Sequence, residues 1–80
     1  MNTSSLDQLR VSEFGLVKDI SPDSNMRRRL QDIGIIKGTK VQCLQKSLFG
    51  DPIAYLIRGA VIAIRKEDAQ NILIETIPES

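Results

Sequence analysis

The 80-residue sequence predicts a small, mainly β domain, a barrel of about five short strands with one helix between the first two. Five short runs rich in aliphatic and β-branched residues are separated by turn residues, which is typical of a small all-β fold. Glycines 38, 50 and 59 fall where such a sheet must turn sharply. Five short strands are too few for two packed sheets, so we expect them to curl into a barrel whose closure protects the edge strands.

The N-terminal part begins with a polar stretch and leads into the first strand. Residues 1–5 are polar, which predicts a disordered N-terminus and a single folded domain over residues 6–77. The next residues predict a short helical turn that carries Leu6 and Leu9. The β-branched and aromatic content of residues 14–20 then predicts the first strand.

A helix is predicted between Ser21 and Gly34. Ser21 is a good N-cap, Pro22 suits the first helical position, and Gly34 stands where a left-handed C-cap residue is favoured. We expect the helix to cover one open end of the barrel. Three apolar residues recur at helical spacing and should form its core-facing side: Met26, Leu30 and Ile33.

The remaining elements are short strands with tight connections. We expect Val41 and Cys43 to share one face of the second strand. Residues 66–71 offer about one helical turn before the last strand. The predicted strands cover residues 40–46, 53–58, 60–65 and 72–77.

Composition argues against catalysis and for a soluble binding module. The chain has no histidine, which excludes Ser-His-Asp and Cys-His catalysis, and one cysteine, Cys43, which we expect to be a buried core residue. The spacing of the carboxylates predicts no metal site, and no cofactor or phosphate-binding motif is present. No segment reads as a signal peptide or a membrane span, so a cytoplasmic protein is expected.

Two surface features are candidates for partner binding. The run Arg27-Arg28-Arg29 is either a solvated helix face or a docking site for an acidic protein surface, with nucleic acid a less favoured partner because aromatic residues are few. Leu48 and Phe49 lie on a predicted turn, where they either fold back over the core or mark a contact site. The residues predicted to bind a partner are Arg27, Arg28, Lys46, Leu48 and Phe49.

Several short motifs, in this order and spacing, resemble the FeoA-like family over residues 6–77. The motifs are Leu30-x-x-Ile33-Gly34, Ile36-x-Gly38-Thr39-x-Val41, Gly50-Asp51-Pro52, Arg58-Gly59 and Ile62-Ala63-Ile64-Arg65-x-x-x-Ala69. The resemblance implies an SH3-like barrel and no catalysis, cofactor or established metal site. It implies an accessory or regulatory role in ferrous iron uptake, through binding to the cytoplasmic, GTPase-bearing part of the ferrous iron transporter.

Two further expectations follow. The family's domain also occurs at the C-terminus of larger metal-responsive repressors. The absence of a helix-turn-helix region here favours a freestanding protein without membrane insertion. The alternative function is a nucleic-acid-binding β-barrel that uses Arg27–Arg29.

Overall fold

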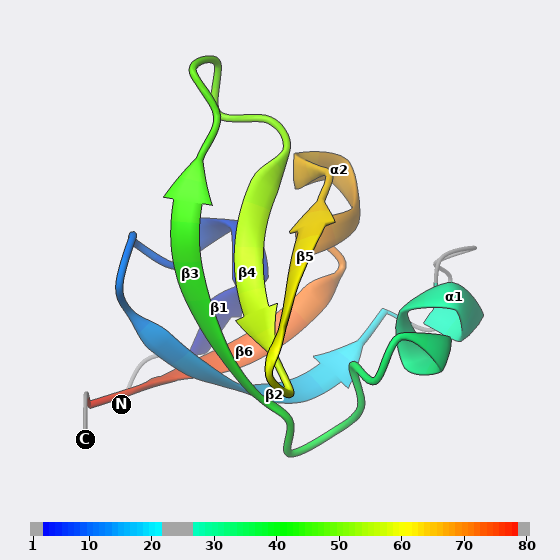
Figure 1. Ribbon diagram of the computed structural model, residues 1–80. Coiled ribbons are helices and arrows are strands. Elements are labelled where there is room, and N and C mark those ends of the chain that lie inside the picture. The colour runs from blue at the N-terminus through cyan, green and yellow to red at the C-terminus, as the bar shows by residue number, and fades with distance from the viewer. Residues whose placement is uncertain (1–2, 22–26, 79–80) are drawn as a thin grey trace.

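The computed structural model describes residues 3–21 and 27–78, which form a curled antiparallel sheet with three short helical segments (Figure 1). The sheet order is β1-β6-β2-β3-β4-β5, and every neighbouring pair is antiparallel. The strands are β1 (Thr3–Ser5), β2 (Phe14–Ile20), β3 (Lys40–Lys46), β4 (Ile53–Ile57), β5 (Ala60–Ile64) and β6 (Ile72–Ile77). The helical segments are the 3₁₀ turn η1 (Leu6–Gln8), α1 (Arg27–Asp32) and α2 (Lys66–Ala69).

The mainly β class and the helical turns at both ends of the chain are confirmed, but the barrel is not closed by hydrogen bonds. In Figure 1, β3, β4 and β5 stand side by side while β2 and β6 cross behind them. The strand order has two ends, so within the described residues β1 and β5 are edge strands. The expectation that closure protects the edges is therefore wrong. The side chains of the curled sheet fill its interior without the two edges having to meet.

The prediction of a disordered stretch over residues 1–5 is wrong for Thr3–Ser5. These residues form β1 and pair with β6, in the register Thr3↔Glu75 and Ser5↔Leu73. Strand pairing uses backbone groups that every such residue carries, so polar side chains did not prevent it. The following Leu6 is fully buried and anchors the strand to the core.

The core is almost entirely aliphatic, as composition predicts. Val41 and Cys43 both point inward from β3, as the alternation required. Tyr55 is the one aromatic ring in the core, and its hydroxyl donates a hydrogen bond of 3.2 Å to the carbonyl oxygen of Leu6. The buried core residues are Leu6, Leu9, Val17, Ile20, Leu30, Ile35, Val41, Cys43, Ile53, Tyr55, Ile57, Ile64, Ala69, Ile72 and Ile74.

The end of α1 follows the prediction, whereas its packing does not. Gly34 has a φ of 98°, and two backbone bonds close the helix: Gly34 N–H to Gln31 and Ile35 N–H to Leu30, at 3.0 and 2.9 Å. Leu30 is buried, but Ile33 is 40% exposed, so its assignment to the core is wrong. The left-handed turn at Gly34 brings Ile35 into the core in its place. The start of the predicted helix and Met26 lie outside the described residues.

The helix does not cover an end of the barrel as expected. It lies to one side of the sheet in Figure 1, and among its described residues only Leu30 is buried. Helix and sheet are joined by the buried side chain of Leu30, by a hydrogen bond from Arg27 to Ile20, and by the loop that follows the helix. The hydroxyl of Thr39 accepts a hydrogen bond from the backbone of Ile36 and donates one to the carbonyl of Gly34, both at 3.1 Å. The motif Ile36-x-Gly38-Thr39 thus connects the end of α1 to the start of β3 through the two hydrogen bonds of the Thr39 hydroxyl.

Candidate partner-binding surfaces

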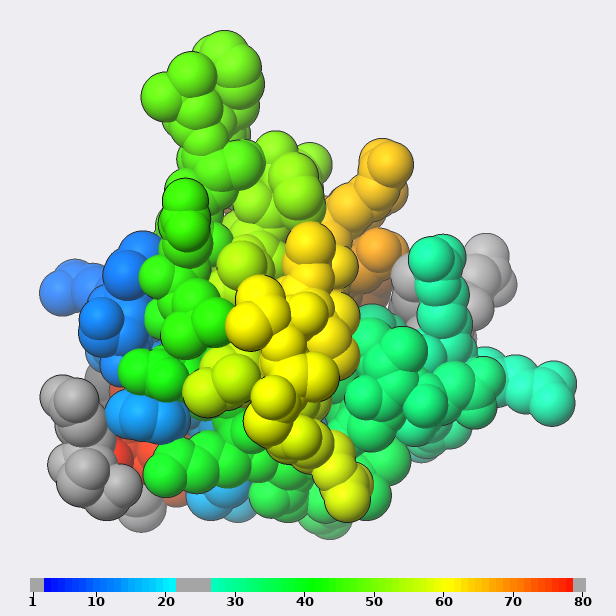
Figure 2. Space-filling model, viewed as in Figure 1, coloured from blue at the N-terminus to red at the C-terminus, as the bar shows by residue number. Residues whose placement is uncertain are grey.

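The β3–β4 hairpin ends in a loop whose tip is the most exposed apolar feature of the described residues. Leu48 and Phe49 are 91% and 92% exposed, and the loop forms the projection at the top of Figure 2. The first of the two alternatives, folding back over the core, is therefore wrong. An exposed leucine next to an exposed phenylalanine is the arrangement expected of a contact site, because both side chains remain in water unless a partner covers them.

The loop is held firmly at its base. The amide of Ser47 donates to the carbonyl of Pro52 at 3.2 Å, and the amide of Gly50 donates to Ser47 at 2.8 Å. Asp51 adds a link to the rest of the fold, because its carboxylate accepts a 2.9 Å hydrogen bond from the amide of Lys66 at the start of α2. The motif Gly50-Asp51-Pro52 therefore positions the tip relative to the barrel, which reduces the entropy that binding would cost.

The predicted basic residues fall into two groups. Lys46 ends β3 beside the hairpin tip and is exposed. Arg28 is exposed on α1, but Arg27 is half-buried, and its guanidinium donates a 3.2 Å hydrogen bond to the carbonyl of Ile20 at the end of β2. Arg27 thus links α1 to the sheet, and its side chain is less available for binding a partner than that of Arg28.

The five predicted residues do not form one continuous patch. The tip lies at the top of Figure 1 and α1 at its lower right, on different sides of β4 and β5. Lys46, Leu48 and Phe49 gather at the hairpin tip, whereas Arg27 and Arg28 lie on the helix. A partner that touches both regions must span the face of the molecule between them.

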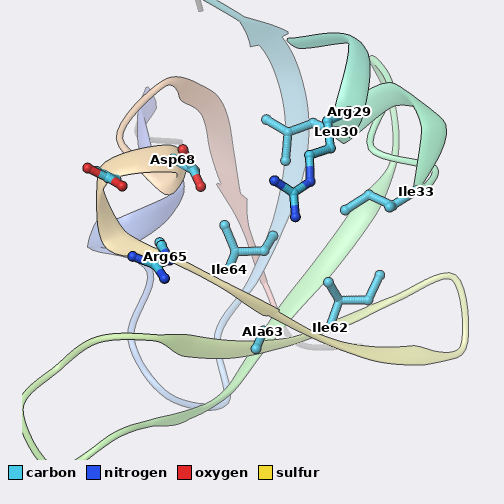
Figure 3. A pocket seen from close by; sticks show the side chains of 9 residues that line it. Arg29, Leu30, Ile33, Ile62, Ala63, Ile64, Arg65 and Asp68 are labelled. Carbon is cyan, nitrogen blue, oxygen red and sulfur yellow. The ribbon is translucent and has the colours of Figure 1, made fainter. Parts of the chain in front are cut away.

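A groove that the sequence prediction missed lies between α1 and β5. Its volume is about 490 Å³, and Figure 3 shows side chains from both walls and from α2 converging on it. Leu30, Ile33, Ile62 and Ile64 supply apolar surface, and the guanidinium of Arg29 points into the groove. Ile33 is partly exposed because its side chain lines this open groove and does not pack in the core. The available signal was the strand sequence Ala-Val-Ile-Ala-Ile at residues 60–64, which carries no charge.

The two groups with reactive chemistry, Cys43 and Tyr55, are buried side by side on β3 and β4. Burial raises the pKa of the Cys43 thiol, although Lys46 opposes the effect, so the reactive thiolate is disfavoured. Burial also raises the pKa of the Tyr55 hydroxyl. Within residues 3–21 and 27–78, no three side chains of histidine, cysteine, aspartate or glutamate gather as they would around a metal ion.

Comparison with protein families identifies the chain. The model of the FeoA domain matches residues 4–76. The chain belongs to the FeoA domain family. The match begins two residues before the predicted boundary and includes most of β1, which agrees with the pairing of that strand to β6.

Solved FeoA structures have the same fold as this FeoA domain. An FeoA-like protein from Clostridium acetobutylicum is 34% identical, with a TM-score of 0.91 over 100% of this chain and 93% of that chain. FeoA from Chlorobium tepidum is 27% identical, with a TM-score of 0.85 over 92% of this chain and 70% of that chain.

A third relative supports the SH3-like class. FeoA from Stenotrophomonas maltophilia in complex with zinc, described as an SH3 domain protein and a candidate ferrous iron transport activating factor, is 21% identical. Its TM-score is 0.79 over 89% of this chain and 88% of that chain. No curated protein matches the sequence. None of the helices in the described parts of this FeoA domain has the length and hydrophobicity needed to cross a membrane.

Proposed function

We propose that this FeoA domain is a cytoplasmic accessory protein of ferrous iron uptake, which binds the cytoplasmic, GTPase-bearing part of the ferrous iron transporter. It acts by binding and regulation and not by catalysis. Family membership supports the link to iron transport. The observation that carries the binding role is the hairpin tip, where Leu48 and Phe49 are exposed on a loop with a fastened base.

The tip supplies the apolar anchor of this interface. Interface energy concentrates in a few buried side chains, and an aromatic ring that is almost fully exposed beforehand has the most surface to lose. Lys46 and the basic side of α1 supply charge complementarity, which affects the association rate and orientation more than the affinity. Arg28, whose side chain is exposed on α1, therefore contributes to the encounter more than to the final affinity.

The direct test is a calorimetric titration of the purified chain with the soluble cytoplasmic domain of the transporter. It is run without nucleotide, with GDP and with a non-hydrolysable GTP analogue. We expect Phe49→Ala to weaken binding by about 1–3 kcal/mol. Arg28→Glu should weaken it less, and mainly at low salt, because exposed charges are screened. Val11→Ala, at another exposed aliphatic residue, is the matched control and should change nothing.

The same titration distinguishes a missing interface from a misfolded variant. Truncation of an exposed side chain changes the free energy of unfolding by less than about 0.5 kcal/mol, so Phe49→Ala should unfold like the parent chain. If no nucleotide state binds at concentrations of about 300 μM, direct binding to the transporter is excluded as the function. If Phe49→Ala binds as well as Val11→Ala, the docking site is not at the tip.

The arrangement of the aromatic residues gives little support to the alternative function, nucleic-acid binding. Base stacking needs exposed rings. Tyr55 is buried, and the ammonium group of Lys40 lies 4.5 Å from the centre of the Phe14 ring. Phe49 is left as a single exposed ring. Titration with single-stranded RNA near 50 mM salt tests this alternative, because phosphate contacts are strongest at low salt.

A further inference from the structure

The outer edge of β5 carries backbone groups with no partner in the described part of the chain. β5 pairs with β4 on one side, and no backbone hydrogen bond joins its other side to any described element. Unpaired amides and carbonyls along a strand edge are a template on which another extended chain can add. The edge is therefore a place where a partner segment could continue the sheet.

The turn between β4 and β5 shows which groups face outward. Arg58 and Gly59 have φ values of 52° and 84°, as in a two-residue type I′ hairpin. In such a hairpin Ile57 and Ala60 bond to each other, and the bonded pairs then alternate along the strands. Ile62 thus bonds to β4, while the amides and carbonyls of Val61 and Ala63 point away from it.

This edge lacks the usual protection against strand addition. Natural edge strands are blunted by charged side chains, proline or a short length. β1, the opposite edge, is three residues long and polar. β5 is five residues long with no charge and no proline, and Val61 is 68% exposed. Of the two edges, β5 is the one that favours pairing.

The groove between β5 and α1 runs beside this edge. β5 forms one wall with Ile62 and Ile64, and α1 forms the other with Leu30 and Ile33 (Figure 3). A strand added to β5 would lie about 4.8 Å from it, within the space that the two walls enclose. Backbone pairing and apolar side-chain burial would then occur at the same place.

We propose that β5 binds one extended segment of a partner protein by strand addition, with apolar side chains in the groove and a carboxylate opposite Arg29. The α1 wall argues for a single segment over a second copy of the chain. The β5 strand of a second copy would bring the rest of its own sheet behind it, and α1 stands in that path.

The charges around the groove give the segment its chemistry. Arg29 points into the groove, and the one salt bridge among the described residues joins other side chains, Lys18 and Glu75. Arg58 and Arg65 flank the two ends of β5, whereas Glu67 and Asp68 lie at the α2 end of the groove. An acidic side chain is therefore favoured in the middle of the segment and disfavoured beside α2.

This interface is separate from the hairpin tip and does not depend on the function proposed above. The tip ends the β3–β4 hairpin, whereas the groove is lined by residues of α1, β5 and α2. A synthetic peptide without any part of the transporter can therefore test it. Failure of peptide binding leaves the titration with the transporter domain unaffected.

The experiment is amide hydrogen exchange by NMR on the labelled full chain, with the peptide Thr-Val-Thr-Glu-Thr-Val-Thr, whose valines and central glutamate share one face of an extended strand. At saturation we expect exchange at the outward amides of Val61 and Ala63 to slow by at least about tenfold, and exchange at Ile62 to change little. A peptide with lysine in place of glutamate should bind about tenfold more weakly. If exchange at Val61 and Ala63 is unchanged at about 5 mM peptide, the proposal is overturned.

Substitutions separate strand addition from other binding. Val61→Pro removes an outward amide without touching the ladder to β4, so it should abolish peptide binding. If that variant does not fold, a peptide with proline in place of the two threonines beside its glutamate makes the same test on the unaltered protein. Arg29→Gln should lower the affinity about fivefold, while the control Arg10→Gln, at an exposed arginine outside the groove, should not. Equal binding of the parent peptide and the proline peptide would show that no strand is added.

Discussion

Replacement of Gly34 by alanine tests whether the backbone conformation or the contact with Arg58 is what requires a glycine after α1. Gly34 has a φ of 98°, a conformation that costs a residue with a Cβ about 1–3 kcal/mol. A Cβ at this position would also lie 3.0 Å from Cδ of Arg58. Because that atom belongs to a flexible, exposed side chain that can move, we assign most of the penalty to the backbone. A domain of 80 residues has a free energy of unfolding of about 4–12 kcal/mol, so the loss should be plainly measurable.

The chain offers a matched control for this substitution. Gly38 has a φ of 91°, and an added Cβ there would meet nothing within 4 Å. Urea unfolding followed by circular dichroism should therefore give Gly34→Ala and Gly38→Ala similar penalties. In an Arg58→Ala background the Gly34→Ala penalty should fall by less than about 0.5 kcal/mol. If the penalty disappears in that background, contact with Arg58 is the dominant cost and the backbone argument is refuted.

Three further predictions concern the core and the loop base. Tyr55→Phe removes one of the two hydrogen bonds to the carbonyl of Leu6, which still accepts from the amide of Leu9, and should lower the free energy of unfolding by about 0.5–1.5 kcal/mol in urea. Asp51→Ala removes the acceptor for the Lys66 amide and should cost about 1 kcal/mol, with faster amide exchange at Lys66 as the local readout. Since burial raises the pKa of Cys43, its thiol stays protonated in the folded state while the unfolded thiol ionises near pH 8.5. Stability should therefore be retained below that pH and decline above it, and the decline should be smaller in Cys43→Ala.

The bounds of the long strands could be predicted because apolar alternation and turn residues agree there. Phe14–Ile20, Lys40–Lys46 and Ile72–Ile77 have the predicted bounds. The strand before Gly59 is one residue shorter than predicted, because Arg58 belongs to the turn. β1 was missed because its pairing depends on the free edge of β6, which no local pattern reveals.

The candidate surfaces were harder to predict, since exposure depends on the whole fold. Leu48 and Phe49 were identified as candidates, but the sequence left open whether they fold back, a choice that depends on loop geometry. Ile33 has the spacing of a core residue, yet the turn at Gly34 places Ile35 inside. The groove beside β5 needs α1, β5 and α2 together, so no single segment indicated it.

The position of β6 also bears on how the chain folds during synthesis. β6 lies between β1 and β2, so the two N-terminal strands are held together only through residues 72–77. The ladder β2–β3–β4–β5 joins strands that follow one another in the chain and can form as they emerge from the ribosome. Completion of the sheet must wait until translation has released the last strand, because its pairings with β1 and β2 span nearly the whole chain. Truncation within β6 would leave β1 and one edge of β2 unpaired at the stage when the nascent chain is most prone to aggregate.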